Sequence, residues 1–259
     1  MKILVCVKEV AELVDQPGIR ADRQWIENDD SVDYRINYYD EFAMEEAVLI
    51  REQLGSVTID AVSVGPDRVE TTLRRALALG ADNAVHIRTS GEEGYLPAAA
   101  VARLIADFAS KGGYDLILAG VMSEDCMERV TGPMIAALLK IPCATSVVEE
   151  KLEPGTGSIL AVCELEGGVK ETVRLSMPAL LTVQSGINRP RYASLSNRLR
   201  AKSQPIEKIN ADTLGMADAG QSVHSVFVPE KTSGGIFIKG SPQEKAKTLV
   251  EILHERTIL

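Results

Sequence analysis

The chain has 259 residues, of which 45% are hydrophobic and 25% are charged, an ordinary composition for a globular protein. Its formal net charge of -9 at pH 7 argues against a nucleic-acid partner, because phosphate backbones favour basic surfaces. The longest apolar runs fall well short of the roughly 20 residues of a membrane span. An expected strand at residues 3–8 begins too early to leave room for a signal peptide, so the sequence favours a prokaryotic cytoplasm over a mitochondrial matrix.

Strands and helices are expected to alternate through most of the chain. Short aliphatic runs predict buried strands, and apolar stripes at helical spacing predict the helices between them. In chain order these are strand 3–8, helix 39–54, strand 57–64, helix 68–79, strand 84–87, helix 96–111, strand 115–119, helix 129–139 and strand 144–148. The polar stretch 11–31 has room for a short edge hairpin. This alternation predicts an α/β fold with a mostly parallel, doubly wound, Rossmann-like sheet.

A β-hairpin is expected to extend or edge this sheet. Residues 160–175 alternate between apolar and polar side chains on either side of a Gly167-Gly168 turn. Pro178 then precedes an apolar run at 179–183, which predicts another buried strand.

The character of the chain changes after Ser185. The following residues are rich in Arg, Ser, Asn, Gly and Pro, until an amphipathic helix is predicted at 242–255. We therefore divide the chain into an α/β domain at 1–185 and an extended arm at 186–259. The arm either docks on its own domain or wraps around a partner.

Parallel sheets bind ligands beyond the carboxyl ends of their strands, where loops meet helix N-termini. Four loops qualify, and they begin near Cys6, Asn37, Val64 and Gly120. The last is the longest and the best candidate for a phosphate, since Thr131 offers a hydroxyl and Arg129 a positive charge. The alternative is that Asp125 only caps the next helix and Arg129 is only solvated.

Signals for catalysis are absent from the sequence. A G-x-G-x-x-G fingerprint does not follow the first expected strand, and no P-loop or Ser/His/Asp arrangement is present. The four cysteines include no C-x-x-C pair and the three histidines are scattered, so we predict neither a catalytic nor a metal site.

The hairpin, followed by Arg191-Tyr192-Ala193-Ser194-Leu195, resembles the signature region of electron transfer flavoprotein β subunits. Further matches include Val5-Cys6-Val7-Lys8, Val62-Ser63-Val64-Gly65-Pro66 and Asp115-Leu116-Ile117-Leu118-Ala119-Gly120. The resemblance implies a heterodimer with an α subunit that holds most of an FAD. It implies an electron carrier without substrate chemistry of its own. Electrons would pass from dehydrogenases, such as acyl-CoA dehydrogenases, to a membrane-bound or soluble acceptor.

The resemblance also implies positions for the ligands. A structural AMP would contact residues of the four loops, namely Cys6, Asn37, Tyr38, Tyr39, Asp40, Val64, Gly120, Val121, Met122, Ser123, Glu124, Asp125, Cys126, Met127, Glu128, Arg129, Val130 and Thr131. A recognition loop of Tyr192, Ala193, Ser194 and Leu195 would dock the donor dehydrogenase, with Leu195 as its anchor. Basic residues around it, Arg191, Arg198, Arg200 and Lys202, fit an acidic partner surface.

Two alternatives stay open. The fourth loop shares Asp125, Thr131 and Gly132 with AMP-holding relatives. It shares Gly132-Pro133 with electron-bifurcating relatives that hold a second FAD in place of AMP. Its Met127, Glu128 and Val130 match neither pattern, although the missing Gln and second Asp argue against bifurcation. The other alternative is a flavin-free, nucleotide-binding regulatory module, which has no need of the basic segment or the long arm.

Overall fold

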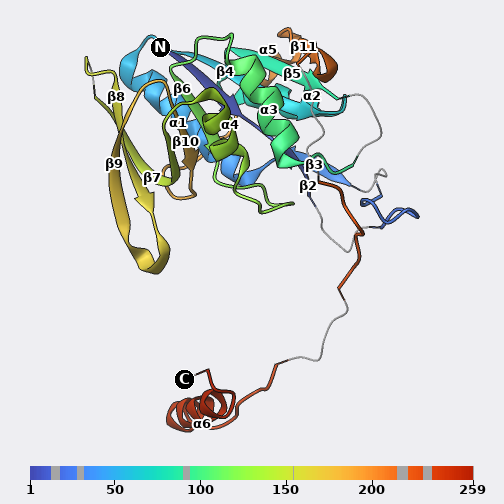
Figure 1. Cartoon of the computed structure of the whole chain (residues 1–259), viewed down its shortest axis with the longest axis vertical. Helices are drawn as coiled ribbons and strands as arrows, with labels where there is room; N and C mark the ends of the chain where they lie inside the picture. The colour runs from blue at the N-terminus through green and yellow to red at the C-terminus, as the bar shows by residue number, and fades with distance from the viewer. Residues whose placement is uncertain are drawn as a thin grey trace. The chain divides into compact units, whose positions relative to one another are not determined.

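The computed structural model describes residues 1–12, 18–27, 32–89, 94–153, 155–214, 221–229 and 235–258. The chain forms two compact units, Met1–Val226 and Phe227–Leu259. The first unit contains the sheet and its covering helices, and the second contains a C-terminal helix (Figure 1).

Among the described residues, one sheet of nine strands organises the first unit, in the order β11-β5-β4-β1-β6-β10-β7-β8-β9. All neighbours are parallel except β7–β8 and β8–β9, which are antiparallel. This confirms the predicted α/β fold with a mostly parallel sheet. The strands are β1 (Lys2–Cys6), β4 (Thr58–Gly65), β5 (Asn83–Arg88), β6 (Leu116–Gly120), β7 (Cys143–Glu153), β8 (Ser158–Glu164), β9 (Lys170–Ser176), β10 (Ala179–Val183) and β11 (Glu207–Asn210).

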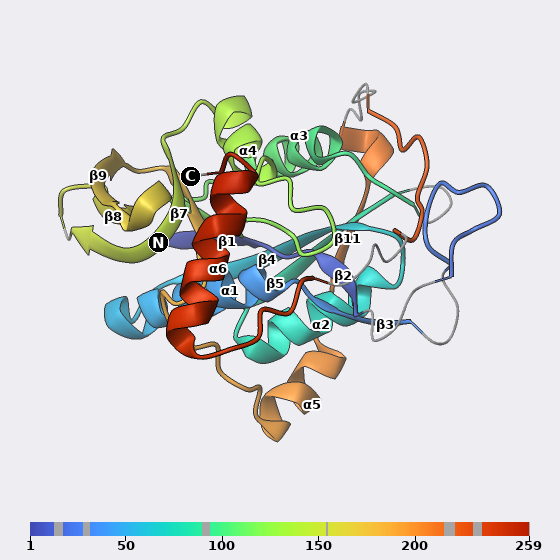
Figure 2. The ribbon, with the colours of Figure 1, turned by 90° about the horizontal axis from the view of Figure 1, so that it is seen from below.

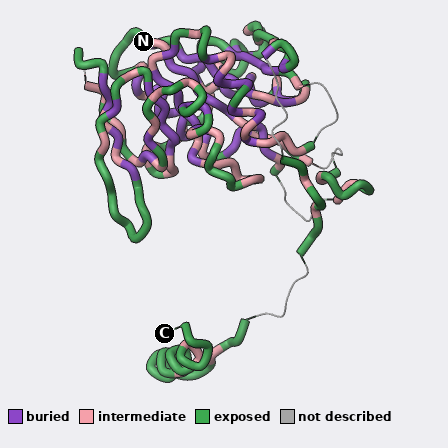
Figure 3. Tube along the Cα trace, viewed as in Figure 1, coloured by how far each residue is buried: buried purple, intermediate pink, exposed green. Residues whose placement is uncertain are grey.

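Helices cover both faces of the sheet, as Figure 2 shows. Successive residues of β1 point to opposite sides: Ile3 packs in a core with α1 (Tyr38–Leu54) and α2 (Val69–Leu79). Leu4 packs in a second core with α3 (Ala98–Ala109) and α4 (Thr131–Leu139). Both cores are largely aliphatic, and the buried residues concentrate along the strands (Figure 3). The doubly wound arrangement thus follows from strands that are apolar on both sides.

The predicted hairpin is present at the far edge of the sheet. β8 and β9 pair antiparallel, and the turn between them includes Gly167 and Gly168, both at positive φ. The strand after it does not lie at an edge, because β10 inserts between β6 and β7. β7 is also longer than the predicted 144–148, since its second half leaves the parallel sheet to pair with β8.

Two elements lie in the tail where the sequence predicts little structure. Helix α5 (Leu195–Ser203) docks on α2 through the buried Ala201, whose carbonyl accepts a hydrogen bond from Arg74. Strand β11 then adds to the sheet beside β5. The first unit therefore runs past residue 185, where the α/β domain was expected to end, while the division of roles between 1–185 and 186–259 stays a prediction.

The edge hairpin expected within residues 11–31 takes a different form. β2 (Glu9–Glu12) and β3 (Asp33–Ile36), which flank that stretch, pair antiparallel in a small sheet of their own. Parts of the stretch itself, residues 13–17 and 28–31, lie outside the described residues.

The predicted C-terminal helix is confirmed as α6 (Pro242–Glu255). Ser241 and Glu244 form a reciprocal capping box at its start. Leu249 and Val250 stay about half exposed, and none of its residues is buried. Across the described part of the chain, no helix has the length and apolarity to cross a bilayer.

A carboxyl pair between α1 and β7 makes stability depend on pH. Burial and, after it, the neighbouring Glu46 together raise the pKa of Glu150 from an ordinary value of 4.5 to about 8. The folded chain then holds a proton that the unfolded chain releases, so stability falls as pH rises from about 4.5 to 8. We expect Glu150→Gln to raise the melting temperature at pH 8 by roughly 2–4 °C, and to leave it unchanged at pH 5. Melting curves across this range measure the effect. The exposed neighbour Glu149, changed to Gln, is the control, and an equally steep pH dependence in Glu150→Gln would contradict the assignment.

Candidate functional site

Most of the residues predicted to contact the nucleotide line one cavity, which lies at the carboxyl ends of β1, β4 and β6. Residues from all four predicted loops line it: Cys6, Asn37, Asp40, Val64, Gly120, Val121, Met122, Ser123, Asp125, Cys126, Glu128, Arg129, Val130 and Thr131. The topology explains why, because parallel strands deliver their following loops to the same edge of the sheet.

Four of the predicted cavity residues lie elsewhere. The Tyr38 ring packs edge-on against Tyr39 and Phe42 on the first turns of α1. The carboxylate of Glu124 accepts hydrogen bonds from the backbone N–H of Tyr38 and from Arg35. Met127 is largely exposed. Tyr38, Tyr39, Glu124 and Met127 therefore do not line the cavity.

Asp40 ties together the elements that frame the cavity. It lies in the first turn of α1, and its buried carboxylate accepts hydrogen bonds from the backbone N–H groups of Lys8 (2.7 Å) and Gly120 (3.0 Å). Burial raises the pKa of Asp40 to about 7, although these hydrogen bonds oppose the shift. One side chain thus joins the ends of β1 and β6 to the start of α1.

Asn37 holds the long loop after β6 in place. Its side-chain amide donates to the carbonyl of Met122 (2.9 Å), and its side-chain oxygen accepts from the N–H of Glu124 (3.0 Å). Asn37 precedes α1 but makes no side-chain cap to it. The side-chain N–H and oxygen of Asn37 are both hydrogen-bonded to the backbone of the loop instead.

Lys8 extends across the cavity to the same loop. Its ammonium donates to Asp125 (2.7 Å), Ser123 (3.3 Å) and the sulfur of Cys126 (3.5 Å). Burial raises the pKa of Asp125, but the charge and hydrogen bonds of Lys8 outweigh it and the net shift is downward. Asp125 therefore pairs with Lys8 rather than capping α4, which has no side-chain cap. The alternative in which Asp125 serves as that cap is wrong.

The start of α4 offers the positive end of the site. Without a side-chain cap, the amide groups of Thr131 and Gly132 at this helix terminus are oriented to attract an anion. Arg129 lines the cavity beside them, and no ion pair joins it to any other described residue. These donors suit a phosphate or carboxylate group.

A bridge of three side chains from separate loops contributes to the cavity lining. The rings of Trp25 and Tyr95 lie 6.0 Å apart, centre to centre, and the Tyr95 hydroxyl donates to Glu128 over 2.6 Å. The hydrogen bond to Glu128 raises the pKa of Tyr95 to about 12. Glu128 is thereby engaged by a hydroxyl donor, which accounts for an acidic residue in a loop that otherwise suits an anion.

Sequence reasoning missed Lys8, Trp25, Tyr95 and Arg68 as lining residues. Lys8 lies two residues beyond the end of β1, which is shorter than the expected strand 3–8, and a charged residue at the end of an aliphatic run is a signal that could have identified it. Trp25, the single tryptophan of the chain, stands in a polar loop, which is also a signal. Arg68 pairs with Glu9 across the cavity edge, and only the fold brings those two together.

The predicted recognition loop lies away from the cavity, which none of its four residues lines. Tyr192 is 96% exposed and Leu195 is 73% exposed. Ala193 packs against the core, and the Ser194 hydroxyl caps α5 by accepting the N–H of Asn197. The segment thus presents Tyr192 and Leu195 to solvent on either side of two fixed residues, Ala193 and Ser194.

Metal ions are not suggested by the site. The described residues contain no group of three or more His, Cys, Asp and Glu side chains suited to a metal. Burial raises the pKa of the Cys6 thiol, which leaves it protonated and unreactive within the cavity wall.

Comparisons with known proteins agree on one family. Residues 24–214 match the model of the electron transfer flavoprotein domain. The chain is 37% identical to the electron transfer flavoprotein subunit beta of Methylophilus methylotrophus, over 98% of both chains. The identity is 36% to the Bacillus subtilis subunit, over 87% of this chain and 88% of that protein. It is 35% to the Homo sapiens subunit, over 95% and 96%.

Proposed function

The chain belongs to the electron transfer flavoprotein family as one of its β subunits, and from this premise we propose that it pairs with an α subunit to carry electrons between a donor dehydrogenase and a downstream acceptor. An FAD at the interface of the two subunits relays the electrons, with most of its contacts in the α subunit. The β chain supplies structure and docking rather than substrate chemistry.

We propose AMP as the resident of the cavity. The observation that carries this is the donor set at one end of it, where the amides that begin α4 lie beside Arg129 and suit a phosphate. Asp40 and Asn37 hold the surrounding backbone rigid, which favours a structural ligand. A cavity of about 170 Å³ is small beside the roughly 300–1,000 Å³ of typical small-molecule sites. Its size favours a mononucleotide over a second FAD.

The test of this proposal is nucleotide content. The chain is coexpressed with its candidate α subunit, the complex is purified and denatured, and the released nucleotides are quantified by chromatography. One FAD and one AMP per heterodimer are expected. Two FAD would favour the bifurcating alternative, and a stable chain without flavin would overturn the redox proposal in favour of a regulatory module.

Tyr95 should protect AMP binding from the charge of Glu128. We expect Tyr95→Phe to weaken AMP binding about tenfold, because a hydrogen bond to a charged group contributes about 1.5–3 kcal/mol and its loss leaves a carboxylate facing an anion site. Adding Glu128→Gln should restore most of the affinity by removing that charge. Calorimetric titration of AMP into the stripped heterodimer measures both. A double variant as weak as the single one would show that Glu128 does not act on the phosphate.

The exposed segment Tyr192–Leu195 is proposed to dock the donor dehydrogenase. The second unit, whose helix α6 buries none of its own residues, is proposed to wrap around the α subunit. Isolation of the partner proteins would identify the donor and would show whether the acceptor is membrane-bound or soluble. We retain the prokaryotic cytoplasm as the proposed location.

A further inference from the structure

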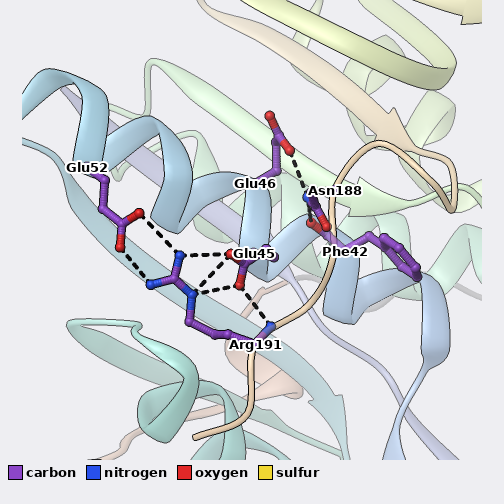
Figure 4. A network of polar contacts seen from close by, with 6 residues as sticks. All are labelled: Phe42, Glu45, Glu46, Glu52, Asn188 and Arg191. Carbon is purple, nitrogen blue, oxygen red and sulfur yellow. Dashed lines mark hydrogen bonds and ion pairs between the residues drawn. The ribbon is translucent and has the colours of Figure 1, made fainter.

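Two residues just before the docking segment are fastened to helix α1, as Figure 4 shows. The guanidinium of Arg191 lies between Glu45 and Glu52. Its Nε and one terminal nitrogen approach the Glu45 carboxylate at 2.8 Å, and the other terminal nitrogen approaches Glu52 at 2.6 Å. The backbone N–H of Arg191 also donates to Glu45 (3.1 Å). Three N–H groups therefore converge on one buried carboxylate.

Asn188 makes a second attachment to the same helix. Its side-chain amide donates to the carbonyl of Phe42 (3.0 Å) and to the carboxylate of Glu46 (2.7 Å). Glu45 and Glu46 are each only 7% exposed, so these contacts are largely shielded from water and from salt. The backbone from Asn188 to Arg191 is thus fixed along successive turns of α1.

The chain is fixed again directly after the docking segment. Ser194 caps α5, and α5 is held on α2 by the buried Ala201 and by Arg200, which donates to the carbonyl of Leu77. Tyr192 and Leu195 therefore extend from a short span whose two ends are both attached to the folded unit.

We propose that Arg191 is a positioning residue: paired with Glu45, it holds the segment Tyr192–Leu195 in the conformation that docks the donor. A preformed segment loses less conformational entropy on binding than a mobile one, and this raises affinity without any new contact. The inference rests on the proposed docking function. Because α1 also carries Asp40 at its start, one helix sets both the nucleotide cavity and the docking segment.

Proteolysis of the heterodimer tests the conformational part. Chymotrypsin cleaves after Tyr192, so the cleavage rate there reports how often the segment opens. We expect Glu45→Gln, which preserves shape and removes the charge, to raise that rate about tenfold, and Arg191→Lys to raise it less because lysine keeps the charge but lacks the planar fork. The matched control is Glu41→Gln, which breaks an ion pair of α1 with Arg75 that does not touch the segment.

Kinetics test the positioning role. With an acyl-CoA dehydrogenase and its acyl-CoA as the donor, we expect Glu45→Gln to raise the KM for the heterodimer about tenfold and to leave kcat and flavin content unchanged. The inference is overturned if Glu45→Gln and Arg191→Gln both leave the cleavage rate and the KM unchanged while Leu195→Ala raises the KM. In that case the docking role of the segment still stands. An unchanged KM in Leu195→Ala would instead remove the docking role, and with it the positioning role, whatever the cleavage rate.

Discussion

Gly120→Ala is expected to empty the cavity of its proposed AMP while the heterodimer keeps the proposed FAD. A Cβ at this position would lie 2.3 Å from the Asp40 carboxylate and 2.9 Å from the backbone carbonyl carbon of Tyr39. The start of α1 must then move, and the hydrogen bond from Gly120 to Asp40 is lost with it. Overpacking and a lost buried hydrogen bond together cost roughly 2–4 kcal/mol. We expect less than about a tenth of the AMP to remain, measured by chromatography of released nucleotides.

Gly94→Ala is the matched control, because Gly94 also lines the cavity and a Cβ there would meet nothing within 4 Å. This variant should retain AMP. Full AMP content in Gly120→Ala would show that the close approach of β6 to α1 does not shape the site. Loss of AMP from both variants would point to a general sensitivity of the cavity rather than to this contact.

The central part of the fold follows from residue patterns that act locally. The aliphatic run of β1 is buried on both sides, so it reads as a central parallel strand. Gly55 ends α1 at positive φ, a conformation that glycine adopts without strain, and its place was evident from the sequence. Such signals depend on neighbours along the chain and need no knowledge of the fold.

Elements stabilised by distant partners gave no such signal. Helix α5 buries only Ala201. Its position on α2 depends on hydrogen bonds from Arg74 and Arg200 to backbone carbonyls of the opposite helix. Strand β11 is mostly exposed and forms because β5 offers a free edge. Polar sequences of this kind are ordered by tertiary contacts, which periodicity does not report.

The candidate site was predictable in position but not in its connections. The rule that ligands lie beyond parallel strands located the loops. It did not reveal that Asn37 would hold the backbone of the loop after β6, or that Lys8 would pair with Asp125. Those contacts join residues far apart in sequence, and only the closed sheet places them together.

Leu195→Ala is expected to give the largest functional loss outside the cavity. A leucine that is 73% exposed contributes little to folding, so stability and flavin content should not change. If it anchors in a pocket of the donor, its truncation removes a hot spot of about 2–4 kcal/mol, or roughly a 100-fold fall in kcat/KM for donor-driven flavin reduction. Stopped-flow reduction by the donor, compared with chemical reduction by dithionite, separates docking from the redox step.

The matched control for this truncation is Leu138→Ala. Leu138 is 43% exposed on α4, which packs on the opposite face of the sheet from α5, so its truncation should leave donor-driven reduction unchanged.

The basic residues beside Leu195 predict that donor-driven reduction also depends on salt. Arg198 and Lys202 stand on a chain of net charge -9, and their attraction to an acidic donor should weaken as salt rises. We therefore expect the reduction rate to fall with ionic strength in the native protein. If the reduction rate changes neither on Leu195→Ala nor with ionic strength, the donor binds another surface.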